Sequence, residues 1–433
     1  MSPAGRRAPA RVETFVTAAD TSPRETALSI VRRLRESGHV ALFAGGCVRD
    51  ELLGREPDDY DVVTTATPDV ISNLFRGRTS HVGAHFGVVI VRERSVMVEV
   101  ATFRTDGSYT DRRRPDAVAF STPEQDARRR DFTVNALFLD PLGTPNLPRA
   151  RGEVIDHVGG IDDLRARVIR AVGDPHARLA EDHLRALRAA RLAAKLSFTV
   201  ERATAEAIRA HASELSGVSR ERIGEELRMM LSHPSRADAA RLMRALSLET
   251  PALHLSPPAG SEFPLLSGLA PHATLLAALS AYAVDLGVSP TAAGAAQVVG
   301  AWRGALCLSN EEQAAIRHAL TSLELLEGGF LDRGMAAQKR AAQKWMFPEA
   351  LALACLRDVE RGERLRRRLR ELDAHAGGIH ATPLIDGDEL IRMGLKPGPA
   401  FKKLLETLYD AQLEGRIATL EEARSLATRL SGG

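Results

Sequence analysis

The chain has 433 residues and a formal net charge of +2, with 44% hydrophobic, 26% charged and 4% aromatic residues. This length allows several domains, and the composition is that of a globular protein with aliphatic cores. No run of about eighteen apolar residues is present, which excludes a membrane-spanning helix. Cys47, Cys307 and Cys355 are far apart and odd in number, which argues against a disulfide framework and for a reducing cytoplasm.

Residues 1–22 contain basic side chains but no apolar stretch like that of a secretory signal, so we expect a disordered leader there. Residues 23–140 combine short strand and helix patterns, and we expect them to form one α/β unit. The expected elements, in chain order, are a helix at 23–38, a strand at 39–46, a helix at 47–54, a strand at 59–65, a helix at 67–75 and a strand pair at 86–91 and 96–103. A polar, arginine-rich loop at 104–116 follows.

From about residue 160 the strand patterns stop and helical periodicity dominates. The stretch DPHARLAEDHLRALRAARLAAKLSF, residues 174–198, predicts one long helix. The sequence therefore predicts an α+β protein, with an N-terminal α/β unit followed by helical domains.

Carboxylates gather where the second strand begins. Asp59 and Asp61 are two residues apart, and alternate residues of a strand share a face at about 6.5–7 Å between Cα atoms. Two such carboxylates can bridge a pair of Mg²⁺ ions. Glu99 interrupts an apolar strand pattern, VMVEVATF, and could join the same acidic cluster. The alternative for Glu99 is an edge-strand charge that discourages aggregation.

Gly45 and Gly46 stand between the first strand and the following helix. A turn of this kind exposes backbone N–H groups, and a helix N-terminus favours phosphate. The pattern is neither a P-loop nor a dinucleotide-binding fingerprint. A glycine turn, an Asp-x-Asp strand and a later acidic strand together indicate metal-assisted nucleotidyl transfer.

The segment GGCVRDELLGREPDDYDVVT resembles the head signature of the tRNA nucleotidyltransferase/poly(A) polymerase family, class II of the polymerase-β-like superfamily. Further motifs follow in the family's order over roughly residues 25–235, and segment 387–423 resembles the tail of many bacterial members. These motifs are VEVATFRTDGSYTDRRRPDAVAF, RRRDFTVNAL, the EDHLRALR core of the long helix, and SRERIGEELRMML.

Beyond the leader at 1–22, the resemblance implies a polymerase-β-like catalytic head at 23–145, a base-reading neck at 146–240, and a helical body at 241–378 and tail at 379–433 that bind RNA. It implies that Asp59 and Asp61 bind the metals, with Glu99 contributing. It also implies a set of nucleotide-binding residues, namely Gly45, Gly46, Arg49, Arg130, Asn135, Asp182, Arg185, Arg188 and Arg191. Arg112 departs from the family pattern, where the flexible loop often has glycine.

The predicted long helix places Arg178, Asp182 and Arg185 at i, i+4 and i+7, on one face. A carboxylate only accepts hydrogen bonds and a guanidinium only donates them. Such a pair complements cytosine and adenine and leaves groups unpaired against uracil and guanine. The alternative is a set of ordinary i,i+3 and i,i+4 salt bridges on an exposed helix.

We therefore expect a cytoplasmic, Mg²⁺-dependent enzyme that adds CCA to the 3′ end of tRNA from CTP and ATP. Poly(A) polymerase, an A-adding enzyme and a non-catalytic RNA-binding protein are the alternatives. Of the histidines, His176 and His183 lie near the motifs, but no pair has zinc-ligand spacing with cysteines. We expect them to be packing or surface residues.

Overall fold

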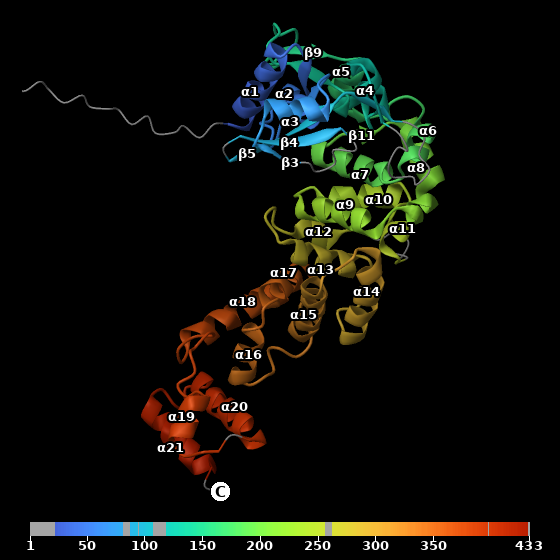
Figure 1. Cartoon of the computed structure of the whole chain (residues 1–433). Coiled ribbons are helices and arrows are strands. Elements are labelled where there is room, and N and C mark those ends of the chain that lie inside the picture. Colours follow the sequence, from blue (N-terminus) through green and yellow to red (C-terminus); the bar gives the residue numbers. More distant parts are fainter. Residues whose placement is uncertain are drawn as a thin grey trace, which may run out of the picture. The chain divides into compact units, whose positions relative to one another are not determined.

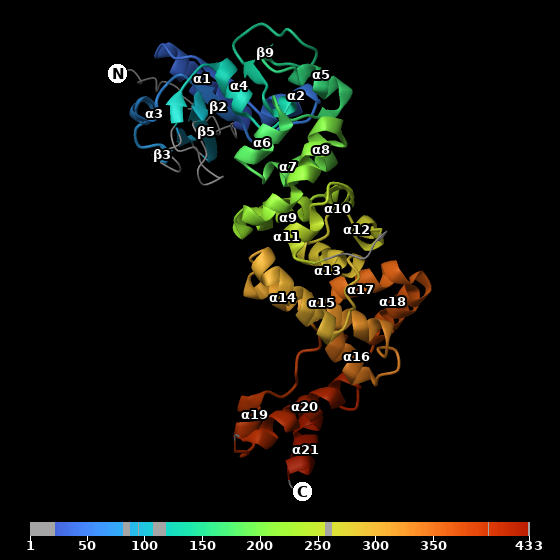
Figure 2. The same cartoon turned by 90° about the vertical axis from the view of Figure 1, so that its right-hand side faces the viewer.

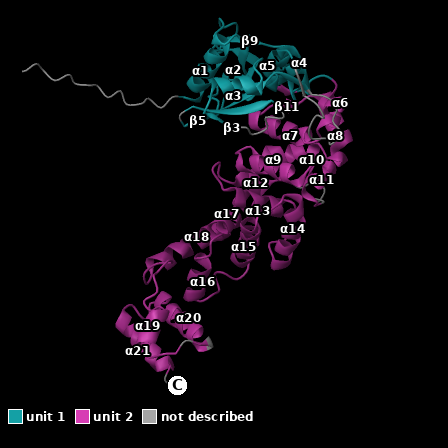
Figure 3. Cartoon of the chain, viewed as in Figure 1, with its two compact units in different colours: residues 1–166, 170–173 teal, residues 167–169, 174–433 magenta. Residues whose placement is uncertain are grey.

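The computed structural model describes residues 22–80, 87–93, 95–106, 118–255, 262–396 and 398–431 (Figure 1). The predicted leader lies outside the described residues except for Ser22, and so does most of the arginine-rich loop, including Arg112. The chain divides into two compact units (Figure 3). The first contains residues up to 166 together with 170–173, and the second contains 167–169 and 174–433.

The first unit is built around a seven-stranded mixed sheet with the strand order β3-β4-β5-β2-β1-β8-β9. A separate antiparallel pair is formed by β6 and β7. The elements are α1 (Pro23–Glu36), β1 (Ala41–Ala44), α2 (Gly46–Leu52), β2 (Asp61–Thr64), α3 (Pro68–Leu74), β3 (Thr79–Ser80), β4 (Val88–Glu93), β5 (Val96–Thr102), β6 (Arg104–Asp106), β7 (Val118–Phe120), α4 (Pro123–Arg129), the 3₁₀ helix η2 (Thr133–Asn135), β8 (Phe138–Asp140), β9 (Glu153–Ile155) and α5 (Gly160–Ala166).

Helix α1 begins as its sequence dictates. The Ser22 hydroxyl accepts from the Glu25 N–H while the Glu25 carboxylate accepts from the Ser22 N–H, and Pro23 occupies the first turn. The buried apolar stripe of α1, which includes Ile30 and Leu34, packs against β1 and β5. Strand β1 is buried along its whole length, so the predicted short, apolar strand is confirmed.

The pairing of the central strands fixes which residues meet at the end of the sheet. Strand β2 runs antiparallel to β1, and Asp61 pairs with Ala44. Strand β2 runs parallel to β5, and Val62 pairs with Val100. The glycine turn that follows Ala44 and the acidic residues of β2 and β5 therefore lie at the same end of the sheet.

The first unit continues past residue 145, where the sequence motifs suggested that the head would end. Strand β9 pairs with β8, and helix α5 packs on η2. Phe132 also forms an isolated bridge with Ala171. The functional division of the chain into head, neck, body and tail stays a prediction.

The second unit is helical apart from the short parallel pair of β10 and β11. Its elements are β10 (Val168–Ile169), α6 (Pro175–Glu181), α7 (Arg185–Leu196), β11 (Thr199–Val200), α8 (Arg202–His211), the 3₁₀ helix η3 (Ala212–Gly217), α9 (Arg220–Ser232), α10 (Arg236–Ala245), α11 (Glu249–Leu253), α12 (Pro264–Gly268), α13 (Leu275–Asp285), α14 (Ala292–Ala305), α15 (Asn310–Glu327), α16 (Met335–Ala342), α17 (Phe347–Arg357), α18 (Val359–Ala374), α19 (Gly387–Arg392), α20 (Pro399–Leu413) and α21 (Leu420–Ser431).

The prediction of one helix over 174–198 is wrong. Helix α6 ends at Glu181 and α7 begins at Arg185, because Asp182 is extended, with φ −154° and ψ 102°. The Asp182 carboxylate accepts a hydrogen bond from the Leu184 N–H, at 3.1 Å, and its carbonyl accepts one from the Arg185 N–H. An aspartate carboxylate that accepts from the N–H two residues later forms an Asx turn, and here this turn interrupts the helical periodicity.

Neighbouring helices of the second unit pack pairwise, as α7 does on α9 and α10, and α15 does on α14 and α17 (Figure 2). A separate apolar cluster joins α19, α20 and α21 and includes Leu390, Leu408 and Ala423. The predicted class, an α/β head followed by helical domains, is confirmed. Among the described residues no helix has the length and apolar character needed to cross a membrane.

A pair of glycines within helices of the second unit allows a stability test. A Cβ added at Gly224 in α9 would lie 2.5 Å from the backbone oxygen of Leu306, whereas one added at Gly300 in α14 would meet nothing within 4 Å. We expect Gly224→Ala to destabilise the second unit by about 1–3 kcal/mol through overpacking. Gly300→Ala should stabilise it by up to about 1 kcal/mol through helix propensity. Urea unfolding followed by circular dichroism measures both, and equal effects would contradict the close packing of α9 on Leu306.

Candidate nucleotidyltransfer site

The turn between β1 and α2 requires glycine at its first position. Gly45 has φ +77°, a conformation that other residues rarely adopt. A Cβ there would also lie 3.1 Å from Nη1 of Arg130. The Gly45 N–H donates to the Leu137 carbonyl at 3.0 Å, which fixes the turn on the β8 side. Gly46 is the first residue of α2, so the N-terminal N–H groups of that helix follow the turn directly.

Asp61 opens β2 beside this turn, since it pairs with Ala44. The prediction that Asp59 and Asp61 lie on one strand is wrong in part, because β2 begins at Asp61 and Asp59 precedes it. The two carboxylates still interact. Limited hydration of the carboxylate raises the pKa of Asp61 to about 6, with further contributions from the charges of Glu99 and Asp59, while Arg130 opposes the shift.

Glu99 lies on β5, one residue before the Val100 that pairs with Val62. Its side chain is exposed. Strand β5 lies between β4 and β2 in the sheet, so the alternative of an edge-strand charge is excluded. The three carboxylates therefore form an acidic cluster at the end of the sheet, as the sequence predicted.

Arg49 and Asn135 are joined by a hydrogen bond behind the glycine turn. Nη1 of Arg49 donates to Oδ1 of Asn135 at 2.5 Å, and the guanidinium forms a bidentate pair with Asp50 at 2.8 and 2.9 Å. Nδ2 of Asn135 donates to Asp131 at 3.2 Å. Arg49 is buried, and these partners balance its charge.

Arg130 connects the RRDF motif to the same turn. Its Nη1 donates to the Asn135 carbonyl at 3.2 Å, its Nε donates to Asp126 at 3.1 Å, and its guanidinium lies 5.1 Å from the ring centroid of Phe138. Asp126 is fully buried and also pairs with Arg129. The structure thus gathers Gly45, Arg49, Arg130 and Asn135 around one turn, beside the acidic cluster.

Cys47 is a packing residue inside α2. Burial raises the pKa of its thiol to about 12, and the nearby charge of Asp61 adds to the shift. The thiol lies 3.3 Å from the Ala44 carbonyl, to which it donates. A thiol with this pKa is protonated at neutral pH, which agrees with the prediction that Cys47 is not a nucleophile.

In the second unit, Asp182 and Arg185 do not share a helix face, so that part of the sequence argument is wrong. Asp182 forms a bidentate pair with Arg222 of α9, at 2.6 and 3.2 Å. Nη1 of Arg185 donates to the Glu181 carboxylate and to the Arg178 carbonyl, each at 2.6 Å. Glu181 also pairs with Arg178 at 2.8 Å.

Arg188 and Arg191 both face the buried carboxylate of Glu226 on α9. Nε of Arg191 lies 2.6 Å from Oε2 of Glu226, and Nη1 of Arg188 lies 3.5 Å from Oε1. The expected stripe of arginines is therefore tied to α9. The salt-bridge alternative describes the contacts of Arg178 and Arg185 correctly, and whether these side chains also read a base stays a prediction.

Sequence reasoning missed several partners of the predicted residues. These are Asp50, Asp126, Glu181, Arg222 and Glu226. Arg222 and Glu226 belong to the SRERIGEELRMML motif, so the motif marked the helix without showing which of its side chains contact Asp182 and α7. The signal that the sequence offered was charge, because Arg222 is opposite in charge to Asp182 and Glu226 is opposite in charge to Arg191.

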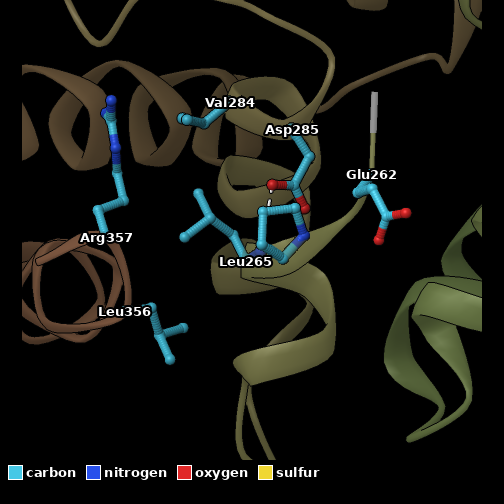
Figure 4. Close-up of a pocket in the computed structure, with 7 residues that line it drawn as sticks. Glu262, Leu265, Val284, Asp285, Leu356 and Arg357 are labelled. Atoms are coloured by element: carbon cyan, nitrogen blue, oxygen red, sulfur yellow. Dashed lines mark hydrogen bonds between the residues drawn. The ribbon is translucent and has the colours of Figure 1, made fainter. Parts of the chain in front are cut away.

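A pocket of about 430 Å³ in the second unit lies apart from these motif residues. Among its lining residues are Leu265, Asp285, Leu356 and Arg357 (Figure 4). The Asp285 carboxylate accepts from the N–H groups of Leu265 and Leu266, at 3.1 and 2.9 Å. Burial raises its pKa to about 6. Asp285 thereby holds the start of α12 on α13, which is a structural task.

The acidic cluster suits a hard divalent cation. Asp59, Asp61 and Glu99 offer only carboxylate oxygens, which Mg²⁺ and similar ions prefer. Burial is the main cause of the raised pKa of Asp61, and the negative charges of Glu99 and Asp59 add to it by repulsion. A divalent ion would relieve this repulsion, so the residues present fit such a group.

The sheet, the acidic cluster and the glycine turn define the class of protein. The model described as "Poly A polymerase head domain" matches residues 41–170, and that described as "Probable RNA and SrmB- binding site of polymerase A" matches residues 197–253. The first unit is thus the head of a template-independent nucleotidyltransferase of the poly(A) polymerase type.

Relatives that align along most of the chain narrow the assignment. The CCA-adding enzyme of Geobacillus stearothermophilus is 32% identical over 412 residues, covering 92% of this chain and 95% of that protein. The CCA-adding enzyme of Limosilactobacillus fermentum is 34% identical over 404 residues, covering 91% and 94%. The chain therefore belongs to the family of CCA-adding enzymes. The crystal structure of the Bacillus stearothermophilus CCA-adding enzyme in complex with CTP is also similar, with a TM-score of 0.75 and 29% identity over 95% of this chain and 98% of that one.

The buried thiol of Cys47 provides a test of the turn's packing. At pH 8 a thiol with a pKa of about 12 is ionised only to the order of 10⁻⁴, and only the thiolate reacts. We expect iodoacetamide to leave Cys47 unmodified in the folded chain while it labels the exposed Cys307. Peptide mass spectrometry before and after unfolding in guanidinium measures this. Equal labelling rates in the folded chain would contradict the burial of Cys47.

Proposed function

We propose that this chain adds C, C and A to the 3′ end of tRNA, using CTP and ATP without a template. The observation that carries the proposal is the similarity to CCA-adding enzymes along more than nine-tenths of the chain, which includes the helical unit as well as the head. The CTP complex of a similar enzyme supports the nucleotide substrate.

The RNA 3′-hydroxyl attacks the α-phosphate of the incoming nucleotide, and pyrophosphate leaves. Asp59 and Asp61, with Glu99, would hold the divalent metal, which we take to be Mg²⁺. When bound, Mg²⁺ lowers the pKa of the attacking hydroxyl and neutralises charge on the triphosphate. The register of β1, β2 and β5 places these carboxylates at the end of the sheet where the glycine turn begins, so triphosphate and metal would meet there.

The glycine turn would bind the triphosphate through the backbone N–H groups of Gly46 and the start of α2, with Gly45 shaping the turn. Arg49 and Arg130 bring positive charge to the same turn. Their contacts with Asn135 hold both guanidinium groups in place, which lowers the entropic cost of orienting them toward a phosphate. Asn135 would thus act by positioning the two arginines.

Base choice falls to the neck in this proposal, with Asp182 as acceptor and Arg185 as donor. Each carboxylate oxygen has two lone pairs, so Asp182 can accept from a base amino group while it keeps Arg222. The Glu181 carboxylate and the Arg178 carbonyl each accept a hydrogen bond from the Arg185 guanidinium and hold it in place. Arg188 and Arg191 would act from further along α7 through their shared partner Glu226.

The helical body and tail would contact RNA. Helix α18 carries four arginines, Arg364, Arg366, Arg367 and Arg370, that line a broad hollow of about 800 Å³. Glu360 and Glu363 line the same hollow, so its charge is mixed. Phosphate contacts of this kind give affinity without sequence preference.

Poly(A) addition is the second candidate, because the matched head and RNA-binding models are named for poly(A) polymerase. The relatives that align with the full length favour CCA addition instead. Incubation of the chain with a tRNA transcript that ends at the discriminator base, and with each NTP separately and together, tests the two. Addition of C, C and A followed by arrest supports CCA addition, and a long run of A supports the alternative.

The acidic cluster is tested by Asp59→Asn and Asp61→Asn. We expect each change to lower kcat for CTP addition at least about 10³-fold, since a lost metal carboxylate removes several kcal/mol of transition-state stabilisation. The melting temperature should stay the same or rise, because each change removes a negative charge from a repulsive cluster. Asp58→Asn, one residue before the pair, is the matched control. Wild-type turnover by Asp61→Asn at saturating Mg²⁺ would refute the assignment.

The base-reading role is tested by Arg185→Ala. Loss of the donor should weaken use of CTP and ATP by about 10²-fold or more and relax discrimination against UTP and GTP. The measurement is kcat/KM for all four NTPs on one tRNA primer. Arg202→Ala on the exposed face of α8 is the control, since that side chain pairs only with Glu206 among the contacts described. A uniform loss across the four NTPs would assign Arg185 a structural or phosphate-binding task.

A further inference from the structure

Four side chains with metal-binding chemistry meet in the second unit, outside the site described above. They are His176 on α6, His183 in the break between α6 and α7, His211 at the end of α8, and Glu214 on η3. Glu214 lies at the centre of the group. Its Oε2 is 3.0 Å from Nε2 of His183, and its Oε1 is 3.0 Å from Nδ1 of His211.

The geometry fits three ligands of one ion. The ligand atoms of His183, His211 and Glu214 all lie within 4.8 Å of one another. Neighbouring ligands of a tetrahedral zinc ion, with bonds of about 2.0–2.1 Å, are about 3.3 Å apart. The two separations of 3.0 Å are close to that value, so a small rearrangement of the carboxylate would admit an ion. Two imidazoles and one carboxylate form a donor set that binds zinc in known enzymes.

His176 supports the ligand role of His211. Nδ1 of His176 lies 3.2 Å from Nε2 of His211, on the other side of the ring from Glu214. If Nδ1 of His211 binds an ion, its Nε2–H can donate to Nδ1 of His176. A metal-bound imidazole usually donates its second N–H to such an acceptor, which fixes the tautomer and the ring orientation.

The group of four side chains is buried on one side and open to solvent on the other. His183 is buried, at 2% exposure, while His211 and Glu214 are partly exposed. An ion could therefore enter from solvent and keep a water as a fourth ligand. The donor set also differs from that of the acidic cluster in the head, since imidazole nitrogen favours transition metals and carboxylates alone favour Mg²⁺.

We propose that His183, His211 and Glu214 form a binding site for a divalent transition metal of the zinc type, with His176 as the positioning residue of His211. The ion ties the break between α6 and α7 to the end of α8 and to η3. Its effect is structural, because His183 is flanked by Asp182 and Leu184, whose contacts start α7. The site does not depend on nucleotide transfer and is independent of the function proposed above.

The test is metal binding by the full chain in which Asp59→Asn and Asp61→Asn remove the acidic cluster of the head. The protein is stripped with a chelator and titrated with Zn²⁺ by calorimetry, and separately with Co²⁺ by visible absorption. We expect one equivalent of Zn²⁺ bound with submicromolar affinity, d–d bands of a four- or five-coordinate Co²⁺ site, and a higher melting temperature with Zn²⁺.

His211→Gln and Glu214→Gln, made in the same background, should each weaken Zn²⁺ binding at least 100-fold and abolish the rise in melting temperature. His176→Gln should weaken binding about 10-fold, since it removes only the orienting partner. His272→Gln on an exposed position is the matched control and should bind as the parent does. Absence of Zn²⁺ binding and of Co²⁺ bands in the parent would overturn the proposal, whatever the variants do. Unchanged affinity in folded His211→Gln or Glu214→Gln would overturn it equally.

Discussion

The register of three central strands governs the head of this protein. Asp61 pairs with Ala44, and Val62 pairs with Val100, so one end of the sheet receives a glycine turn and three carboxylates at once. A slip of one residue in either pairing would turn Asp61 or Glu99 to the opposite face. The buried Val98 and Val100 of β5, which alternate with exposed residues, oppose such a slip of β5, because it would move them out of the core. In β5 the apolar core and the position of Glu99 are thus specified by the same alternation.

Burial of the Asp61 carboxylate raises its pKa to about 6, and repulsion from Glu99 and Asp59 adds to the shift, so the negative charges of the cluster are mutually unfavourable. The neighbouring arginines do not neutralise the cluster completely, because each has its own carboxylate. Arg49 pairs with Asp50, and Arg130 pairs with Asp126. The positive charge near the turn is therefore held in position, while the negative charge at the end of the sheet is left for a cation. Carboxyl groups with raised pKa values beside other carboxylates cluster at functional sites.

The second unit uses ion pairs for a different purpose. Helix α9 presents Arg222 to Asp182 and the buried Glu226 to Arg188 and Arg191, so it fixes both the break before α7 and the first turns of α7. The His183 group fixes the same break from the side of α8 and η3. The EDHLRALR segment is therefore held by charged contacts from α9 on one side and from the His183 group on the other. A single substitution in either set of contacts would change the conformation of this segment.

The sequence by itself determined the order of the head elements, the glycine turn and the acidic residues of both strands, because these depend on local periodicity, turn chemistry and short motif spacing. Its motifs also resemble those of one family. Relatives that align along more than nine-tenths of the chain then established that the chain belongs to this family. The sequence could not determine that α6 and α7 are separate helices. Local periodicity through 174–198 is helical, and the break at Asp182 depends on Arg222, forty residues later in the chain. Only the tertiary structure decided that Glu99 lies on an interior strand and that His183, His211 and Glu214 meet, because strand order and contacts between elements distant in sequence are set by packing and leave no local pattern.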